Sequence, residues 1–252
     1  MSGSTLPFLR RASLRATAPA GGYPFDLPAV RGLDGVEFAM VTAFVGDNGS
    51  GKSTVIEALA VAAGFNPEGG SRNLNFETHR THSALHEHLQ LEWNGRPRWG
   101  WFLRAETFYG MATHIANDND VKTGIARLFP DLHNRSHGES FLELALARFN
   151  GPGLYLLDEP EAALSVTGQL ALLAIMHRAC ALGAQFLLST HSPLLMAYPG
   201  AAIYELSSDA PPTARAFDEV DSVRMWRLFL DNPTPFFDEL FSDDDGESTE
   251  SE

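Results

Sequence analysis

The stretch that decides the fold reads VGDNGSGKST and spans residues 45–54. Gly46, four intervening residues and then Gly51-Lys52-Ser53 have the spacing of a P-loop. The preceding run, 40–45, is apolar and partly β-branched, which predicts a buried strand. Good helix formers follow at 54–63 and stop at Gly64, which predicts a helix. Strand, glycine-rich loop and helix are together the context in which this pattern binds phosphate.

The chemistry of the loop agrees with that interpretation. Glycines let successive backbone N–H groups turn toward an oxyanion, and the helix N-terminus adds the positive end of its dipole. Lys52 is expected to reach the β- and γ-phosphates, and the Ser53 hydroxyl to contact Mg²⁺. The alternative is a glycine-rich turn that binds nothing. The predicted phosphate-binding residues are Gly46, Asp47, Asn48, Gly49, Ser50, Gly51, Lys52, Ser53 and Thr54.

A second motif, GLYLLDEPE at 153–161, predicts a buried strand that ends in two carboxylates. Asp158 would lie at the carboxyl end of a parallel strand beside the phosphate loop, where it can hold Mg²⁺ together with Ser53. Glu159 follows directly and is expected to orient the attacking water or to act as its general base. A pair of exposed acids without function is the alternative when the motif is considered alone.

A third motif, FLLSTHSP at 186–193, is an apolar strand followed by His191. A histidine at the carboxyl end of a strand next to the carboxylate strand could sense the γ-phosphate, and a structural histidine is the alternative. The predicted catalytic residues are therefore Glu159, His191 and Lys52. The predicted metal ligands are Ser53 and Asp158.

The charge of the chain limits its partners. The net charge is −14 over 252 residues. The segment 242–252 contributes −6 and is too polar to pack, so an acidic disordered tail is expected after a single domain at 1–241. The remaining −8 argues against a strongly basic nucleic-acid surface, although a local basic patch stays open.

The chain has no run of eighteen apolar residues, so no membrane insertion is expected. Its first residues lack the apolar core and cleavage site of a secretory signal. The single cysteine, Cys180, excludes an internal disulfide and fits a reducing compartment, so a cytoplasmic location is expected.

Strand-like and helix-like segments alternate along the chain, which predicts an α/β fold with a mainly parallel sheet core, flanking helices and a small antiparallel β part near the N-terminus. FFDELF, at 236–241, has apolar residues at helical spacing and is interpreted as a docking segment. Further strands are expected at 9–15, 36–39, 89–93, 99–104, 154–158, 186–190 and 202–206, and further helices at 140–149 and 162–182.

These motifs resemble those of an ABC-type ATPase head, of the soluble class that includes the Rad50, SMC and RecF proteins. The family's Walker A motif is matched by GDNGSGKST, its Walker B motif with the following glutamate by LYLLDEPE, and its switch-histidine segment by STHSP. The resemblance covers most of 7–240 and is closest to small, stand-alone bacterial AAA-family ATPases. It implies a P-loop NTPase fold of the ABC-ATPase type with ATP and Mg²⁺ as ligands.

The resemblance also implies a composite site. The family signature is matched by Ser136, His137, Gly138 and Glu139 before the helix at 140–149. In relatives this segment contacts the γ-phosphate bound to the other subunit, which implies a head-to-tail homodimer on ATP binding. The implied activity is an ATPase whose hydrolysis drives dimer closure and opening.

Two departures from the family pattern stand out. Ser165 replaces the aspartate usual at the end of the loop after Walker B. The family's glutamine between Walker A and the signature has no clear match, so Gln90, Glu106 or neither fills that role. The residues that contact adenine are also open, with Tyr23 and Phe25 as the aromatic candidates.

The process that the ATPase drives is open between three classes. The first is a clamp in DNA maintenance or defence, with DNA or an unidentified protein as partner. The second is the nucleotide-binding subunit of an ABC transporter, which needs a transmembrane partner. The third is an ATP-gated protein scaffold with little turnover, which Glu159 disfavours because such a scaffold needs no general base.

Overall fold

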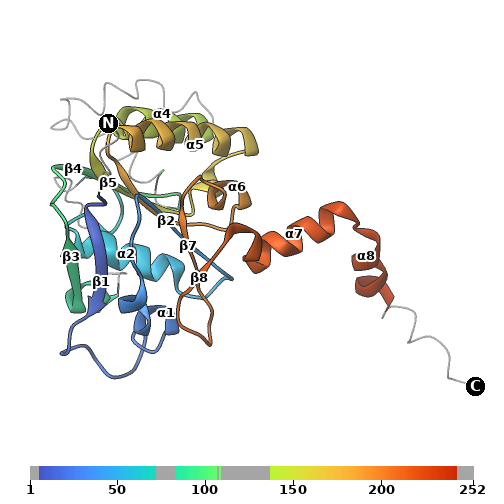
Figure 1. Ribbon diagram of the computed structural model, residues 1–252, viewed down its shortest axis with the longest axis horizontal. Helices are drawn as coiled ribbons and strands as arrows, with labels where there is room; N and C mark the ends of the chain where they lie inside the picture. Colours follow the sequence, from blue (N-terminus) through green and yellow to red (C-terminus); the bar gives the residue numbers. More distant parts are fainter. Residues whose placement is uncertain (1–5, 72–82, 107, 109–136, 243–252) are drawn as a thin grey trace, which may run out of the picture.

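A computed structural model describes residues 6–71, 83–106, 108 and 137–242. Its central element is a six-stranded sheet in the order β4-β5-β6-β2-β7-β8 (Figure 1). The strands are β2 (Val41–Val45), β4 (Trp99–Arg104), β5 (Gly153–Asp158), β6 (Gln185–Ser189), β7 (Ala202–Glu205) and β8 (Thr213–Arg215). All neighbouring pairs are parallel except β7 with β8. The mainly parallel α/β fold predicted from the sequence is confirmed.

The strand order explains why the three motifs meet. β2, which leads into the glycine-rich loop, lies between β6 and β7. β5 lies one strand further along, with β6 between it and β2. The register pairs Asp158 with Ser189 and Phe44 with Ser189, so the ends of all three strands lie at one edge. In a parallel sheet this carboxyl edge is where ligands bind.

A second, two-stranded sheet pairs β1 (Leu9–Leu14) with β3 (Leu89–Trp93) in antiparallel register. This is the small antiparallel part predicted near the N-terminus. Gln185 ties it to the main sheet, because its side-chain amide donates to Leu9 O and its side-chain oxygen accepts from Leu9 N, each at 2.8 Å. Gln185 is fully buried, so these bonds satisfy a polar group that would otherwise be costly there.

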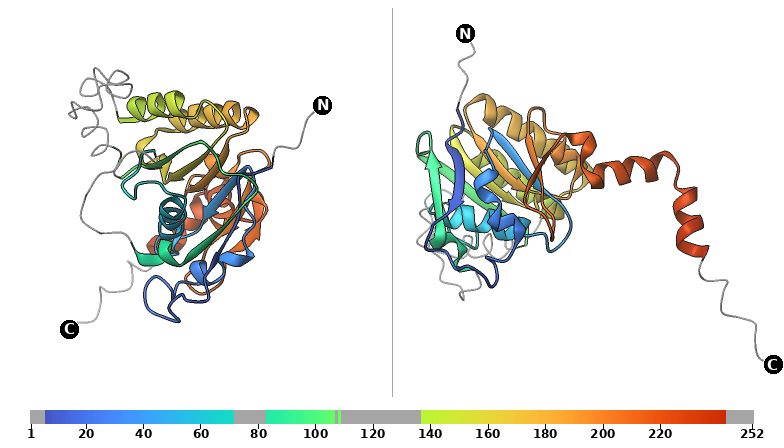
Figure 2. Two further views of the ribbon diagram at one scale, coloured as in Figure 1. Left: turned by 90° about the vertical axis from the view of Figure 1, so that its left-hand side faces the viewer. Right: turned by 60° about the horizontal axis from the view of Figure 1, so that its bottom comes forward.

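Helices cover both faces of the main sheet (Figures 1 and 2). Short α1 and the P-loop helix α2 share one core with the β1–β3 sheet, and α4, α5 and α6 share the other. Both cores are built from apolar side chains that alternate across the strands, as the sheet pleat requires. The bounds are α1 (Pro28–Arg31), α2 (Lys52–Ala62), α4 (His137–Arg148), α5 (Val166–Ala181) and α6 (Pro193–Met196).

Several predicted bounds were wrong. The expected strand at 36–39 is only an isolated bridge between Glu37 and Arg11. The helix expected to begin near 162 begins at Val166, because a 3₁₀ turn, η5 (Pro160–Ala163), comes first. The other 3₁₀ turns of the described ranges are η1 (Leu33–Gly35), η2 (Ala84–His88) and η6 (Phe217–Glu219), and β8 was not predicted.

The last described elements form an arm that extends from the body (Figures 1 and 2). It consists of α7 (Asp221–Asp231) and α8 (Thr234–Phe241). The FFDELF segment belongs to α8, where Leu240 and Phe241 are 69% and 64% exposed. Phe236 and Phe237 contact Phe229 of α7, so the segment packs on α7 and leaves its last two apolar side chains exposed. Among the helices of the described ranges, none has the length and apolar composition needed to cross a bilayer.

Candidate functional site

The glycine-rich loop has a backbone that only glycine can adopt at its key position. Gly46 has a φ of 130°, and a Cβ there would lie 2.1 Å from Leu206 O. Gly49 and Gly51 also have positive φ, and Gly51 is the N-cap residue of α2. The loop therefore curls closely around the start of α2, where the first N–H groups of the helix are free to bind an anion.

Lys52, the first residue of α2, lies largely buried beneath the loop, and its Nζ donates to Asp47 O at 2.9 Å. Burial lowers the pKa of its ammonium group, although Glu159 and Asp158 act in the opposite direction. The Ser50 hydroxyl is buried without a hydrogen-bond partner in the structure. A buried cation and an unsatisfied hydroxyl beside a glycine cradle fit a phosphate group.

The residues predicted to bind metal and water line one cavity of about 460 Å³ next to the loop. Its polar lining comes from a hydroxyl on α2 and carboxylates after β4 and β5, an oxygen donor set of the kind that Mg²⁺ prefers. Within the described ranges, no group of three or more His, Cys, Asp or Glu forms a separate metal centre. The lining residues are Ser53, Ala105, Glu106, Asp158, Glu159, Ala162 and Ala163.

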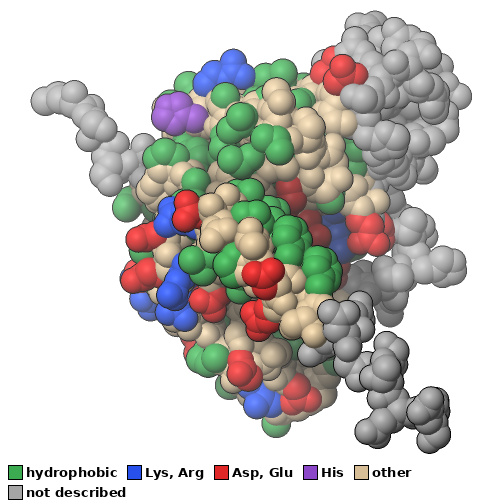
Figure 3. All heavy atoms as spheres, turned by 90° about the vertical axis from the view of Figure 1, so that its right-hand side faces the viewer, with side chains coloured by type: hydrophobic (Ala, Val, Ile, Leu, Met, Phe, Trp, Pro, Cys, Tyr) green, Lys and Arg blue, Asp and Glu red, His purple; other side chains and the backbone are tan. Residues whose placement is uncertain are grey.

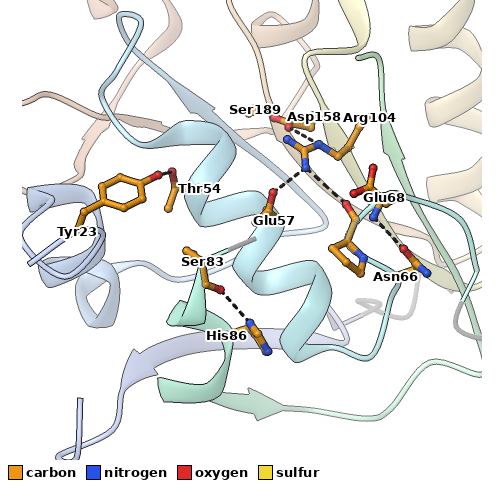
Figure 4. Close-up of polar contacts among 11 residues, drawn as sticks. Tyr23, Thr54, Glu57, Asn66, Glu68, Ser83, His86, Arg104, Asp158 and Ser189 are labelled. Carbon is orange, nitrogen blue, oxygen red and sulfur yellow. Dashed lines mark hydrogen bonds and ion pairs between the residues drawn. The ribbon is translucent and has the colours of Figure 1, made fainter. Parts of the chain in front are cut away.

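Asp158 uses its two carboxylate oxygens for different partners. Ser189 Oγ donates to Asp158 Oδ1 at 2.5 Å, and Arg104 Nε lies 3.3 Å from Asp158 Oδ2. Arg104 also donates from Nη1 to Glu57 Oε2 at 2.6 Å (Figure 4). All three side chains of the Arg104–Glu57–Asp158 cluster are largely buried, with exposed fractions of 17%, 16% and 7%. A guanidinium therefore holds the predicted metal-binding carboxylate in place.

Glu159 is the one non-glycine residue with positive φ in the described part of the chain, at φ 47° and ψ 52°. Its N–H donates to Ser189 O at 3.1 Å, which keeps the backbone in this sparsely populated region. Such conformations typically cost about 1–3 kcal/mol and cluster at functional sites. The turn places Glu159 Oε1 3.6 Å from His191 Nε2, so two of the three predicted catalytic side chains are neighbours.

Glu161 connects the turn after β5 to the histidine segment. Its Oε1 accepts a hydrogen bond from the backbone N–H of His191, and Thr190 bonds the same carboxyl group. Burial is the main reason that the pKa of Glu161 is raised, while the hydrogen bonds act to lower it. Ser192 Oγ in turn donates to Gln169 Oε1 at 2.6 Å. These contacts hold the segment 190–192 against the η5 turn and α5.

The predicted signature segment is described only in part. Ser136 lies outside the described residues, and His137, Gly138 and Glu139 are the first three residues of α4. A Cβ on Gly138 would lie 3.1 Å from Ala163 O, so α4 begins close to the η5 turn. The signature helix thus starts at residue 137 and ends at Arg148, close to the predicted 140–149.

The structure separates the alternatives that the sequence left open. Glu106 lines the cavity with Asp158, whereas Gln90 lies on β3 opposite Ser13 in the two-stranded sheet. Ser165 is the N-cap of α5, and its hydroxyl accepts from Gly168 N at 3.2 Å. A serine at this position therefore has a local role that favours it as a helix cap.

Of the aromatic candidates, Phe25 is buried, whereas Tyr23 is 74% exposed. The Tyr23 hydroxyl lies 3.2 Å from Thr54 Oγ1 (Figure 4). Tyr23 and Ser53 also line a second cavity of about 340 Å³, which extends to Arg104. Tyr23 is therefore the better placed of the two beside the loop.

Sequence reasoning missed four residues around this site: Arg104, Glu57, Ser189 and Glu161. One signal was available, because Arg104 ends a predicted strand just as Asp158 does, and the ends of parallel strands meet at one edge. Glu57 is on the P-loop helix one turn after Ser53, which faces the same region. The helical spacing alone does not show that it pairs with Arg104.

Comparison with known proteins adds one family match. A family model described as "AAA domain, putative AbiEii toxin, Type IV TA system" matches residues 41–97 and 76–197. Antigen peptide transporter 1 of Rattus norvegicus is 28% identical over 201 residues, which is 70% of this chain. The chain spans only 27% of the length of that relative.

Two of the solved structures with a similar fold are an SMC head domain and a transporter subunit. The SMC head domain from Thermotoga maritima is 18% identical with a TM-score of 0.47, covering 83% of this chain and 99% of that chain. An ATP-binding subunit of an ABC transporter is 20% identical with a TM-score of 0.46, covering 92% and 99%.

Proposed function

Because the chain belongs to the family described as "AAA domain, putative AbiEii toxin, Type IV TA system", we propose that it binds Mg·ATP and hydrolyses it to ADP and phosphate. The observation that carries this proposal is the shared cavity of Ser53, Asp158 and Glu159 beside the buried Lys52. A phosphate-binding loop alone would support binding. A carboxylate poised at the same cavity supports hydrolysis.

The loop and the residues around it have proposed roles in holding the substrate. The loop amides and Lys52 bind the β- and γ-phosphates, and Ser50 supplies a further hydroxyl donor. Ser53 and Asp158 hold Mg²⁺, which would neutralise charge on the phosphates. Arg104 fixes the orientation of Asp158, and Tyr23 contacts the base or ribose beyond Thr54.

Glu159 and His191 are the proposed chemical groups. Glu159 accepts a proton from the attacking water while the water oxygen forms a bond to the γ-phosphorus. The bond from that phosphorus to the bridging oxygen breaks, and ADP leaves with the bonding electrons. His191, next to Glu159, donates a hydrogen bond to a γ-phosphate oxygen, where charge gathers in the transition state.

We propose further that two copies pair head-to-tail on ATP binding. Ser136 and the first three residues of α4, which are His137, Gly138 and Glu139, would then complete the partner copy's site. The N-terminus of α4 suits an anion, because the first N–H groups of a helix and the positive end of its dipole lie at that end. Removal of one such transition-state donor typically costs about 2.7–4 kcal/mol in electrostatic sites of this kind.

For the work done by hydrolysis, we favour a cytoplasmic clamp in DNA maintenance or defence. The description of the matched family, which names a toxin of a toxin–antitoxin system, supports the defence side. The identity to a peptide transporter supports a second candidate, the nucleotide-binding subunit of an ABC transporter. An ATP-gated scaffold with little turnover is a third candidate, which the position of Glu159 disfavours.

The decisive experiment is steady-state ATP hydrolysis by the purified chain, with and without DNA. Glu159→Gln should lower kcat by roughly 10²-fold or more, because it removes the general base while leaving the loop intact. Glu92→Gln, on an exposed position of β3, is the matched control and should retain the wild-type rate.

The three outcomes differ in meaning. Turnover accelerated by DNA supports the clamp, and turnover indifferent to DNA directs the search to protein or membrane partners. ATP binding without turnover in the wild type, under every condition, would overturn the proposed hydrolysis.

A further inference from the structure

The arm formed by α7 and α8 carries an unusual share of exposed apolar surface. Half of the large hydrophobic side chains that are exposed in the described part of the chain belong to this arm. They are Met225, Trp226, Leu228, Leu230, Phe237, Leu240 and Phe241. Contiguous apolar surface of this kind on a protein typically marks an interaction site.

The apolar side chains form one continuous face. Met225, Trp226, Phe229 and Leu230 lie on one side of α7 at helical spacing. The face continues onto α8, because the Phe229 ring contacts Phe236 and Phe237 edge-on, with centroids 5.4 and 5.8 Å apart. Those contacts stabilise the corner between the two helices and leave the outer side of both free.

The root of the arm is anchored, so the face is held in a defined position. Val220 and Val223 are buried in the core that contains α4 and α5. The N–H of Asp221 donates to Glu205 Oε1 at 3.0 Å, which fastens α7 to the end of β7. Beyond Val223 each side chain of α7 is at least partly exposed. The exposed face is therefore a feature of a fixed helix.

The charge around this face is strongly acidic. Residues 217–241 include two arginines and six exposed acidic residues. One of the arginines, Arg227, lies over the Phe217 ring, 5.4 Å from its centroid. The sequence of 243–252 adds six acids and no apolar residue, so it cannot cover an apolar face. The acids of the arm and its root are Asp218, Glu219, Asp221, Asp231, Asp238 and Glu239.

A cavity at the root of the arm is lined by both acidic and apolar side chains. It has a volume of about 530 Å³, with Asp47 and Asp221 among its polar lining and Trp226, Phe229 and Phe236 among its apolar lining. Figure 3 looks onto this side of the molecule, where hydrophobic side chains gather at the centre and acidic ones lie around them. Lys and Arg side chains fit such a cavity, because their aliphatic part can pack on the apolar surface while their charged group pairs with a carboxylate.

From this combination we propose that the arm is the docking site for a basic amphipathic helix of a protein partner. The apolar side of that helix covers the α7–α8 face, and its Lys or Arg side chains pair with the acids at the rim. This is the helix-in-groove mode of recognition, with charge complementarity setting the choice of partner.

The same charges disfavour the other occupants. Pairing of two arms would bring their two acidic rims together, which is repulsive. The acids of the rim likewise repel anionic lipid and nucleic acid from this face. A basic helix is the occupant that gains from both the apolar face and the acids.

The test uses a fluorescent peptide of about 20 residues, with Leu on one helical face and Lys elsewhere, whose binding to the full chain is followed by anisotropy. The double variant Met225→Ser, Leu230→Ser should weaken binding at least roughly tenfold, because it removes two exposed apolar contacts. Leu182→Ser, which alters another exposed leucine just after α5, is the control and should leave binding unchanged. Added salt should weaken binding, and a peptide with Glu in place of Lys should not bind.

Four results would overturn the proposal. They are equal peptide affinity of the arm variant and the wild type, no binding of the Lys peptide, and equal binding of the Glu peptide. The fourth is a different occupant. It would be shown by a wild-type dimer in sedimentation that the arm variant dissociates, or by arm-dependent flotation with phosphatidylglycerol vesicles. Unchanged melting temperatures of both variants would establish that the fold is intact.

Discussion

Arg104 joins two carboxylates, with Nη1 2.6 Å from Glu57 Oε2 and Nε 3.3 Å from Asp158 Oδ2. The three residues come from the end of β4, the P-loop helix α2 and the end of β5. The pairing therefore links the elements that carry Ser53 and Asp158, the two proposed metal ligands.

Removal of this arginine should destabilise the fold. Arg104→Ala leaves Glu57 and Asp158 buried without their cation, a change that typically costs about 3–5 kcal/mol. Urea denaturation followed by circular dichroism would measure the free energy of unfolding. Arg98→Ala, at an exposed position just before β4, is the control and should change that free energy by less than about 0.5 kcal/mol. A loss as small as that of the control would contradict a supporting role of Arg104.

The glycine at the start of the loop should tolerate no side chain. In Gly46→Ala the new Cβ would meet Leu206 O at 2.1 Å, a backbone atom that cannot swing away. The φ of 130° adds strain, so the free energy of unfolding should fall by at least about 1–3 kcal/mol, with loss of ATP binding. Gly95→Ala, where a Cβ meets nothing within 4 Å, should be nearly neutral. Thermal melting and nucleotide titration of the two variants would check this contrast.

Lys52 should show opposite effects on binding and on stability. Lys52→Met removes the proposed charge-assisted bonds to phosphate, worth about 1.5–3 kcal/mol, so ATP affinity should fall roughly 10- to 150-fold. Burial lowers the pKa of Lys52 in the folded state, so folding at neutral pH works against its charge. The variant should therefore unfold at a higher urea concentration than the wild type, and a lower midpoint would show that the Asp47 hydrogen bond outweighs burial.

Glu161 should make stability depend on pH in a defined direction. Its pKa in the folded state is raised above the ordinary value of 4.5, so the folded chain binds more protons than the unfolded chain between these two pKa values. Stability from this group is present below pH 4.5 and is lost as the pH rises through the folded-state pKa.

Glu161→Gln keeps an oxygen acceptor for the His191 N–H but carries no charge. At neutral pH it should be at least as stable as the wild type, and its advantage should vanish as the pH falls toward 4.5. Glu161→Ala should instead lose about 1–3 kcal/mol, because the His191 N–H loses its acceptor. Urea unfolding of the three proteins from pH 4 to pH 8 would measure these differences, and a Gln advantage that grows toward low pH would contradict the assignment.

The sequence by itself determined the class of fold and the identity of the motif residues. The order of apolar strands and helices predicted the parallel sheet, because hydrophobic periodicity reports which side of each element is buried. The P-loop spacing and the strand ending in Asp158 and Glu159 placed the proposed catalytic groups at the ends of strands. These are local patterns, readable within a few residues.

Only the tertiary structure decided which side chains meet between distant segments. Arg104 with Asp158, Glu161 with His191, and Gln185 with Leu9 are pairs separated by 54, 30 and 176 positions along the chain. Their contacts depend on strand order and register, which no local pattern carries. The exposed arm is a second example, since helical spacing in FFDELF predicts an apolar face but not whether anything packs against it. Whether that face is covered depends on where α7 leaves the body.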